Sequence, residues 1–146
     1  MSLWRRIAIE KLPELQCKIA NGGSAYNVWL ELHDEFNRAY SVEPRNESLI
    51  SRIYEYAVWC SRQPHNADLR TAVTVCFYET LPLDIVVRGD LSRWLSPDEF
   101  AALRPVFGYH LSESEIKRLA EDFIAETSRR DWHRRVSVDV SDRYAR

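Results

Sequence analysis

The chain has 146 residues, a formal net charge of −2 and a hydrophobic fraction of 45%. A chain of this length can bury a core of its own without metals or disulfides, so we expect a single domain. The three cysteines, Cys17, Cys60 and Cys76, form no C-x-x-C pair, which argues against a zinc site and a disulfide framework. This cysteine usage favours a reducing compartment, and we expect the cytoplasm.

The first twelve residues alternate charged and apolar side chains, without the apolar run of a signal peptide. No later stretch approaches the roughly 20 apolar residues that a membrane span requires. We therefore expect neither export through a signal peptide nor a membrane partner.

Predicted helices follow one another along the chain with short connections. The expected segments are, in chain order, 2–20 with a bend or break at Pro13, 25–40, 47–63, 69–81, a helix from residue 96, and 112–128. Five side chains stand where N-caps are expected: Ser24, Asn46, Asp68, Ser96 and Ser112. Residues 83–95 fit either short helical turns or an extended piece. The pattern predicts an all-α bundle or short helical array of about six to seven helices.

We expect residues 1–128 to form the helical domain and residues 129–146 to form an arginine-rich C-terminal tail. The tail carries six Arg and three Asp, which leaves −5 for the rest of the chain. Val136, Val138 and Val140 alternate with polar residues, so the tail is predicted to be a short strand or an extended segment. It either docks on its own domain or pairs with a second copy or another protein.

Arginine dominates the basic residues, since only Lys11, Lys18 and Lys117 among the 20 are lysines. Arginine is favoured over lysine in ion pairs and interfaces, which makes Arg129, Arg130 and Arg134 candidate partner-binding residues. Trp132 and His133 between them also fit phosphate contacts and base stacking. The neighbouring Asp residues and the acidic body lead us to expect no nucleic-acid partner.

On helical wheels, His33 and Glu79 fall within apolar sectors. They could form a general acid/base pair, with Tyr78 beside them in an aromatic pocket, or bind a metal together with His110 or Glu35. The alternative is that each is a core polar group satisfied by its neighbours. No motif predicts a catalytic, cofactor or metal site, so we expect no cofactor. The alternative function is that of a small-molecule-binding protein or a hydrolytic enzyme that uses His33, Glu79 and Tyr78.

Trp59 projects onto the polar stripe of its predicted helix, about 20° from Arg52 on an ideal wheel. Because Trp and Arg are enriched in interface hot spots, Trp59, Arg52 and Trp132 are candidate partner contacts. The alternative is that another part of the same chain covers Trp59.

Several segments resemble a family of small uncharacterised bacterial helical proteins. They are Trp29-Leu-Glu-Leu-His33, Tyr54-Glu-Tyr-Ala-Val-Trp-Cys60 within Leu49 to Pro64, Phe77-Tyr-Glu-Thr-Leu-Pro82, and Asp90-Leu-Ser-Arg-Trp-Leu95 through Phe107-Gly-Tyr-His110. The resemblance covers about residues 1–126 and implies no assigned activity. In size, acidity and helical content such families resemble adaptor and immunity proteins. We therefore expect a non-catalytic cytoplasmic module that binds another protein or a second copy of itself.

Overall fold

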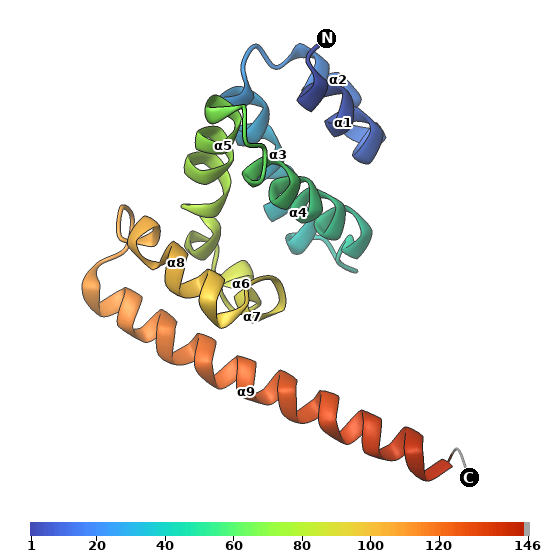
Figure 1. Cartoon of the computed structure of the whole chain (residues 1–146), viewed down its shortest axis with the longest axis vertical. Coiled ribbons are helices and arrows are strands. Elements are labelled where there is room, and N and C mark those ends of the chain that lie inside the picture. The colour runs from blue at the N-terminus through green and yellow to red at the C-terminus, as the bar shows by residue number, and fades with distance from the viewer. Residues whose placement is uncertain (145–146) are drawn as a thin grey trace. The chain divides into compact units, whose positions relative to one another are not determined.

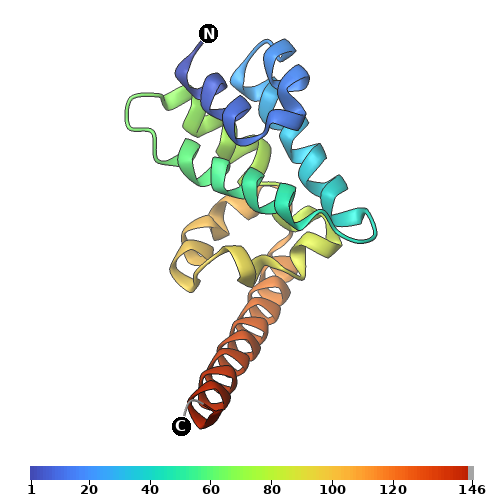
Figure 2. The same ribbon diagram turned by 90° about the vertical axis from the view of Figure 1, so that its right-hand side faces the viewer.

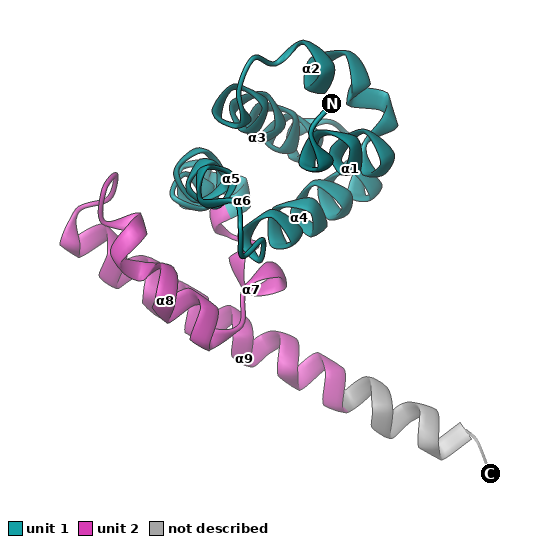
Figure 3. Ribbon diagram, turned by 45° about the horizontal axis from the view of Figure 1, so that its top comes forward, with its two compact units in different colours: residues 1–87 teal, residues 88–146 magenta. Residues whose placement is uncertain are grey.

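The structure is a computed structural model that describes the backbone of residues 1–144 and the side chains of residues 1–135. Its chain divides into two compact units, residues 1–87 and residues 88–146 (Figure 3). Both units are built from helices, which confirms the expected all-α class. The predicted boundary after residue 128 falls inside the last helix, so a functional division there stays a prediction.

Unit 1 is a set of helices around α3, α4 and α5, which pack on one another (Figure 1). Its elements are, in chain order, α1 (Leu3–Lys11), the 3-10 turn η1 (Pro13–Leu15), α2 (Gln16–Asn21), α3 (Ala25–Ser41), α4 (Glu47–Ser61), α5 (Ala67–Val73), the π-helix η2 (Thr74–Tyr78), the 3-10 turn η3 (Leu81–Leu83) and α6 (Ile85–Arg88), whose last residue begins unit 2. Helix α1 packs on α4, and α2 packs on α3. The predicted break at Pro13 is confirmed, because this proline begins η1 and separates α1 from α2.

The core of unit 1 is built from aromatic rings of α3, α4 and η2. Trp29 stacks on Tyr56 with ring centroids 5.3 Å apart, and Phe77 lies 5.3 Å from Trp29. All three rings are fully buried. Such ring pairs add about 0.5–1.5 kcal/mol each beyond the apolar area they bury, so these contacts hold the three central elements together.

The predicted N-caps explain where most helices begin. The side chains of Ser24, Asn46 and Ser96 accept hydrogen bonds from backbone N–H groups of α3, α4 and α8 (Pro97–Phe107). Ser112 and Glu115 form the predicted capping box at the start of the last helix. The prediction for Asp68 is wrong: Asn66 caps α5, because its side-chain oxygen accepts the Leu69 N–H and starts the helix two residues earlier.

The π-helix η2 changes which side chains of the fourth predicted helix, residues 69–81, are buried. The Glu79 N–H donates to the Thr74 carbonyl, 2.8 Å away and five residues back. This wider turn rotates the following side chains away from their α-helical positions. Tyr78, which an ideal wheel places opposite the buried Leu69, is therefore only 7% exposed. Val75 lies within the π-helix and is 43% exposed.

Unit 2 consists of α7 (Leu91–Trp94), α8 and α9 (Glu113–Tyr144). Figure 2 shows α9 as one continuous helix. Both α7 and α8 pack against α9. Phe100 of α8 and Phe123 of α9 stack with centroids 4.2 Å apart, and both are nearly buried.

Two predictions about the secondary structure are wrong in detail. Within residues 1–144 there are nine α-helices rather than six to seven, because Pro13 splits the first helix and residues 85–94 form α6 and α7. The predicted strand or extended tail at Val136 to Val140 is helical, since α9 continues to Tyr144. An isolated strand leaves its backbone groups without partners, whereas an existing helix extends with one internal hydrogen bond per added residue.

Candidate functional site

His33 lies on α3 and is half-buried. Its Nε2 is 3.3 Å from the Asn37 amide nitrogen, and its ring meets Phe77 edge-on at 6.5 Å. Burial lowers the pKa of His33, against smaller raising effects from Asp34 and Asp84. The imidazole is therefore held in its neutral form by apolar surroundings, as expected for a core polar group.

Tyr78 and Glu79 lie at the end of η2. The Tyr78 ring is buried against Tyr54, at 6.3 Å, and Phe77, at 5.5 Å. Glu79 is half-buried, and its charge is one of two causes that raise the pKa of the Cys76 thiol, after burial. Burial likewise raises the pKa of Cys60 to about 12, so both thiols stay protonated at neutral pH and are poor nucleophiles.

The buried carboxylate of unit 1 is Glu35, which the wheel analysis had considered only as an accessory metal ligand. Glu35 is 7% exposed and lies 2.6 Å from Lys18 Nζ and 2.7 Å from Arg38 Nη1. An ideal wheel places Glu35 about 20° from the buried Val28, so the burial of Glu35 could have been predicted from the sequence. Its partners lie on both sides of the α2–α3 connection, and the cluster acts as a clamp between these helices.

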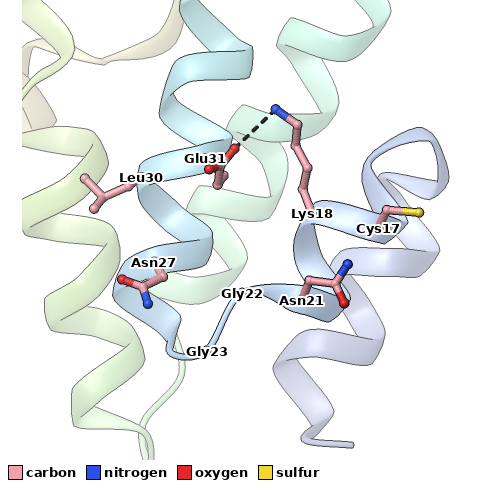
Figure 4. Close-up of a pocket in the computed structure, with 8 residues that line it drawn as sticks. All are labelled: Cys17, Lys18, Asn21, Gly22, Gly23, Asn27, Leu30 and Glu31. Carbon is pink, nitrogen blue, oxygen red and sulfur yellow. Dashed lines mark hydrogen bonds and ion pairs between the residues drawn. The ribbon is translucent and has the colours of Figure 1, made fainter.

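A shallow groove of about 730 Å³ runs beside this clamp, between α2 and α3 (Figure 4). Figure 4 shows Lys18 of α2 reaching Glu31 of α3, at 3.2 Å. The helices approach closely because Gly22 lies between them, where a Cβ would collide with the Val28 side chain. The charged lining residues of this groove, Lys18 and Glu31, pair with each other and so join α2 to α3.

Arg52 and Trp59, the candidate partner contacts of α4, both make contacts within unit 1. Arg52 forms a two-pronged ion pair with Glu14 and donates to the Lys11 carbonyl at 3.0 Å. The pairing with Arg52 is the main cause of the lowered pKa of Glu14. Trp59 is half-buried and stacks on Tyr56 at 5.9 Å. A role of either residue in partner binding stays a prediction.

The candidate residues of α9 converge on a second groove, of about 660 Å³, between α7 and α9. We call it the arginine groove. Its lining residues are mostly basic: Ser92, Arg93, Glu126, Arg129, Arg130, His133 and Arg134. Sequence reasoning found the three α9 arginines but missed Ser92 and Arg93, because their approach to α9 is a contact between segments about 40 residues apart.

Two fixed hydrogen bonds position Arg130 in this groove. Its Nε donates to Ser92 Oγ at 2.8 Å and its Nη2 donates to Asp90 Oδ1 at 2.6 Å. Asp90 also lies 3.6 Å from Arg93, whose guanidinium stacks over the Trp94 ring at 4.2 Å. One carboxylate at the start of α7 thus orients two arginines.

Glu126 is the second carboxylate, at 3.5 Å from Arg129 and 3.6 Å from Arg130. Four arginines therefore face two carboxylates, and the groove has an excess of positive charge. Arg134 and Arg129 are exposed at its edge. Trp132, 61% exposed, meets the lining residue His133 edge-on at 5.0 Å. The geometry suits an anionic surface, because one guanidinium group can donate two parallel hydrogen bonds to one carboxylate.

Within the described residues, no three His, Cys, Asp or Glu side chains lie close enough together to hold a metal ion. In the same residues no helix is both long and apolar enough to cross a membrane. No protein-family model matches the chain, and neither a characterised protein nor a solved structure matches it.

Proposed function

We propose that this protein is a non-catalytic interaction module that binds another protein through the arginine groove of α7 and α9. The partner presents an acidic segment to this groove. A reducing compartment, the cytoplasm, agrees with the free cysteines Cys17, Cys60 and Cys76. Adaptor and immunity-like proteins, to which the chain is linked only by analogy in size, acidity and helical content, act by binding another protein.

The convergence of four arginines on one groove beside the exposed Trp132 is the observation that supports this proposal. Arg and Trp are enriched among the residues that carry binding energy in protein interfaces. Asp90 and Ser92 already order Arg130, so less side-chain entropy is lost when a partner binds. The net positive charge speeds encounter with an acidic partner and makes binding sensitive to salt.

The alternative, a small-molecule binder or hydrolase built on His33 and Glu79, finds no comparable support. The side chain next to the imidazole nitrogen of His33 is that of Asn37, and the ring beside it is that of Phe77. The charges that act on His33 come from Asp34 and Asp84.

Affinity capture with charge-reversal variants tests the proposal. The tagged chain, its Arg129→Glu/Arg134→Glu variant and an Arg118→Glu control are used as baits in a lysate of the protein's own host. Arg118 is an exposed arginine of α9 outside the groove. We expect one near-stoichiometric protein with the wild type and the control, and its loss with the double variant. Equal recovery with all three baits would contradict the proposal.

A further inference from the structure

Unit 2 has a second hollow, separate from the arginine groove. It lies between α8 and α9 and has a volume of about 360 Å³. We call it the α8–α9 pocket. This volume is within the range of small-ligand pockets, roughly 300–1,000 Å³.

The walls of the pocket are apolar. Phe100 and Phe123 form a stacked pair in its lining, and Ala101 and Ala120 contribute only methyl groups on the two helices. Ile124 stands at its edge and is 65% exposed. An apolar chain of several methylene groups would be removed from water against these side chains, which favours its binding.

Arg104 is the only charged residue among those that line the pocket. It is exposed, so its guanidinium can reach an anion at the mouth. Thr127 and Ser128 add hydroxyl groups at the α9 side, and the Thr127 hydroxyl donates to the Phe123 carbonyl at 2.8 Å, which leaves its oxygen free to accept. An apolar interior with one cation at the rim complements a molecule that has an apolar chain and one carboxylate.

We propose that the α8–α9 pocket binds a small amphiphilic carboxylate, with the alkyl chain against Phe100 and Phe123 and the carboxylate paired with Arg104. This site does not depend on the proposed protein partner. The pocket spans from Pro97 to Arg104 along α8, which is about 10 Å at 1.5 Å per residue. That length suits a medium alkyl chain rather than a long peptide helix.

Titration of the full chain with octanoate, followed by amide ¹H–¹⁵N NMR, tests this inference. Octanol has the same chain length without the charge and serves as the matched ligand. We expect saturable shifts at residues 97–104 and 120–128 with octanoate, and weaker binding of octanol. Arg104→Gln should weaken octanoate binding about fivefold, equivalent to about 1 kcal/mol, and leave octanol binding unchanged.

A second pair of variants tests the location. Ala120→Phe fills the pocket and should abolish the shifts caused by both ligands, whereas Ala125→Phe, on an exposed position of α9 outside the lining, should not. The absence of saturable shifts with octanoate would overturn the inference and leave the pocket to a protein segment. Equal affinity for octanoate and octanol, unchanged by Arg104→Gln, would overturn the assignment of a carboxylate.

Discussion

Glu35 is a buried carboxylate held between two cations, Lys18 and Arg38. Its desolvation is offset by these two charge-assisted contacts, so neutralising it removes their benefit while the buried polar group remains. Glu31, by contrast, makes a half-exposed pair with Lys18 at 3.2 Å. The two glutamates therefore contribute very differently to the same clamp.

We predict that Glu35→Gln lowers the free energy of unfolding by about 1.5–3 kcal/mol, the usual contribution of hydrogen bonds to charged groups. Glu31→Gln, the matched control, should lower it by less than about 1 kcal/mol. Urea denaturation at neutral pH measures both. Equal losses for the two variants would show that burial of Glu35 does not control the strength of the clamp.

His33 makes unfolding depend on pH. Burial lowers its pKa below the ordinary 6.5, so the unfolded chain takes up a proton at a higher pH than the folded chain does. The stability linked to His33 is therefore fully present above pH 6.5 and is lost as the pH falls below 6.5 toward the pKa in the folded chain. Glu14, whose pKa is also lowered, acts only at lower pH, below its ordinary value of 4.5.

We predict that the wild type loses more unfolding free energy than His33→Gln does when the pH is lowered from 7.5 to 5.5. Urea denaturation of both proteins at these two pH values measures the difference. If the two proteins change in parallel, protonation of His33 is not linked to unfolding and the imidazole is not held neutral by burial.

At the scale of elements, local sequence signals located helix starts well and helix registers less well. The caps at Ser24, Asn46, Ser96 and Ser112 were predictable because each depends on residues within one turn. The π-helix at Thr74 was not, because a wheel at 100° per residue assumes α geometry throughout. The contact of Ser92 with α9 depends on tertiary packing, which no local pattern contains.

A deletion in the π-helix tests whether η2 contains one residue more than an α-helix with the same buried side chains would need. Deleting the exposed Val75 should convert η2 to α-helix while Cys76, Phe77 and Tyr78 keep their buried orientations. We predict a cooperative thermal transition for this variant in circular dichroism.

Deletion of the exposed Glu55 in α4 is the control. It rotates the rest of α4 by about 100° and takes the fully buried Tyr56 out of the core, so it should cost several kcal/mol and abolish the transition. Equal damage from both deletions would contradict the interpretation of η2 as a one-residue bulge.

At the scale of the whole molecule, the division into residues 1–87 and residues 88–146 was not predicted, because both parts have the same helical composition and no linker separates them. The ring cluster of Trp29, Tyr56 and Phe77 lies entirely within residues 1–87. This unit thus has the core that independent folding requires.

We predict that a fragment of residues 1–87 folds alone and unfolds cooperatively, as followed by tryptophan fluorescence in urea. Phe77→Ala in the same fragment should cost about 3–5 kcal/mol, as expected for a large buried ring. A fragment without a cooperative transition would mean that its core is incomplete without residues 88–146.

The central proposal concerns the surface that the partner covers, and the sequence offered two surfaces: Arg52 with Trp59 on α4, and the arginines of α9. In the structure Arg52 forms an ion pair with Glu14, and the α9 arginines Arg129, Arg130 and Arg134 line one groove. Hydrogen–deuterium exchange of the full chain, with and without the captured partner, distinguishes these surfaces directly. We predict slower exchange in α7 and residues 126–135, with residues 52–59 unchanged; slower exchange confined to residues 52–59 would contradict the assignment of the arginine groove.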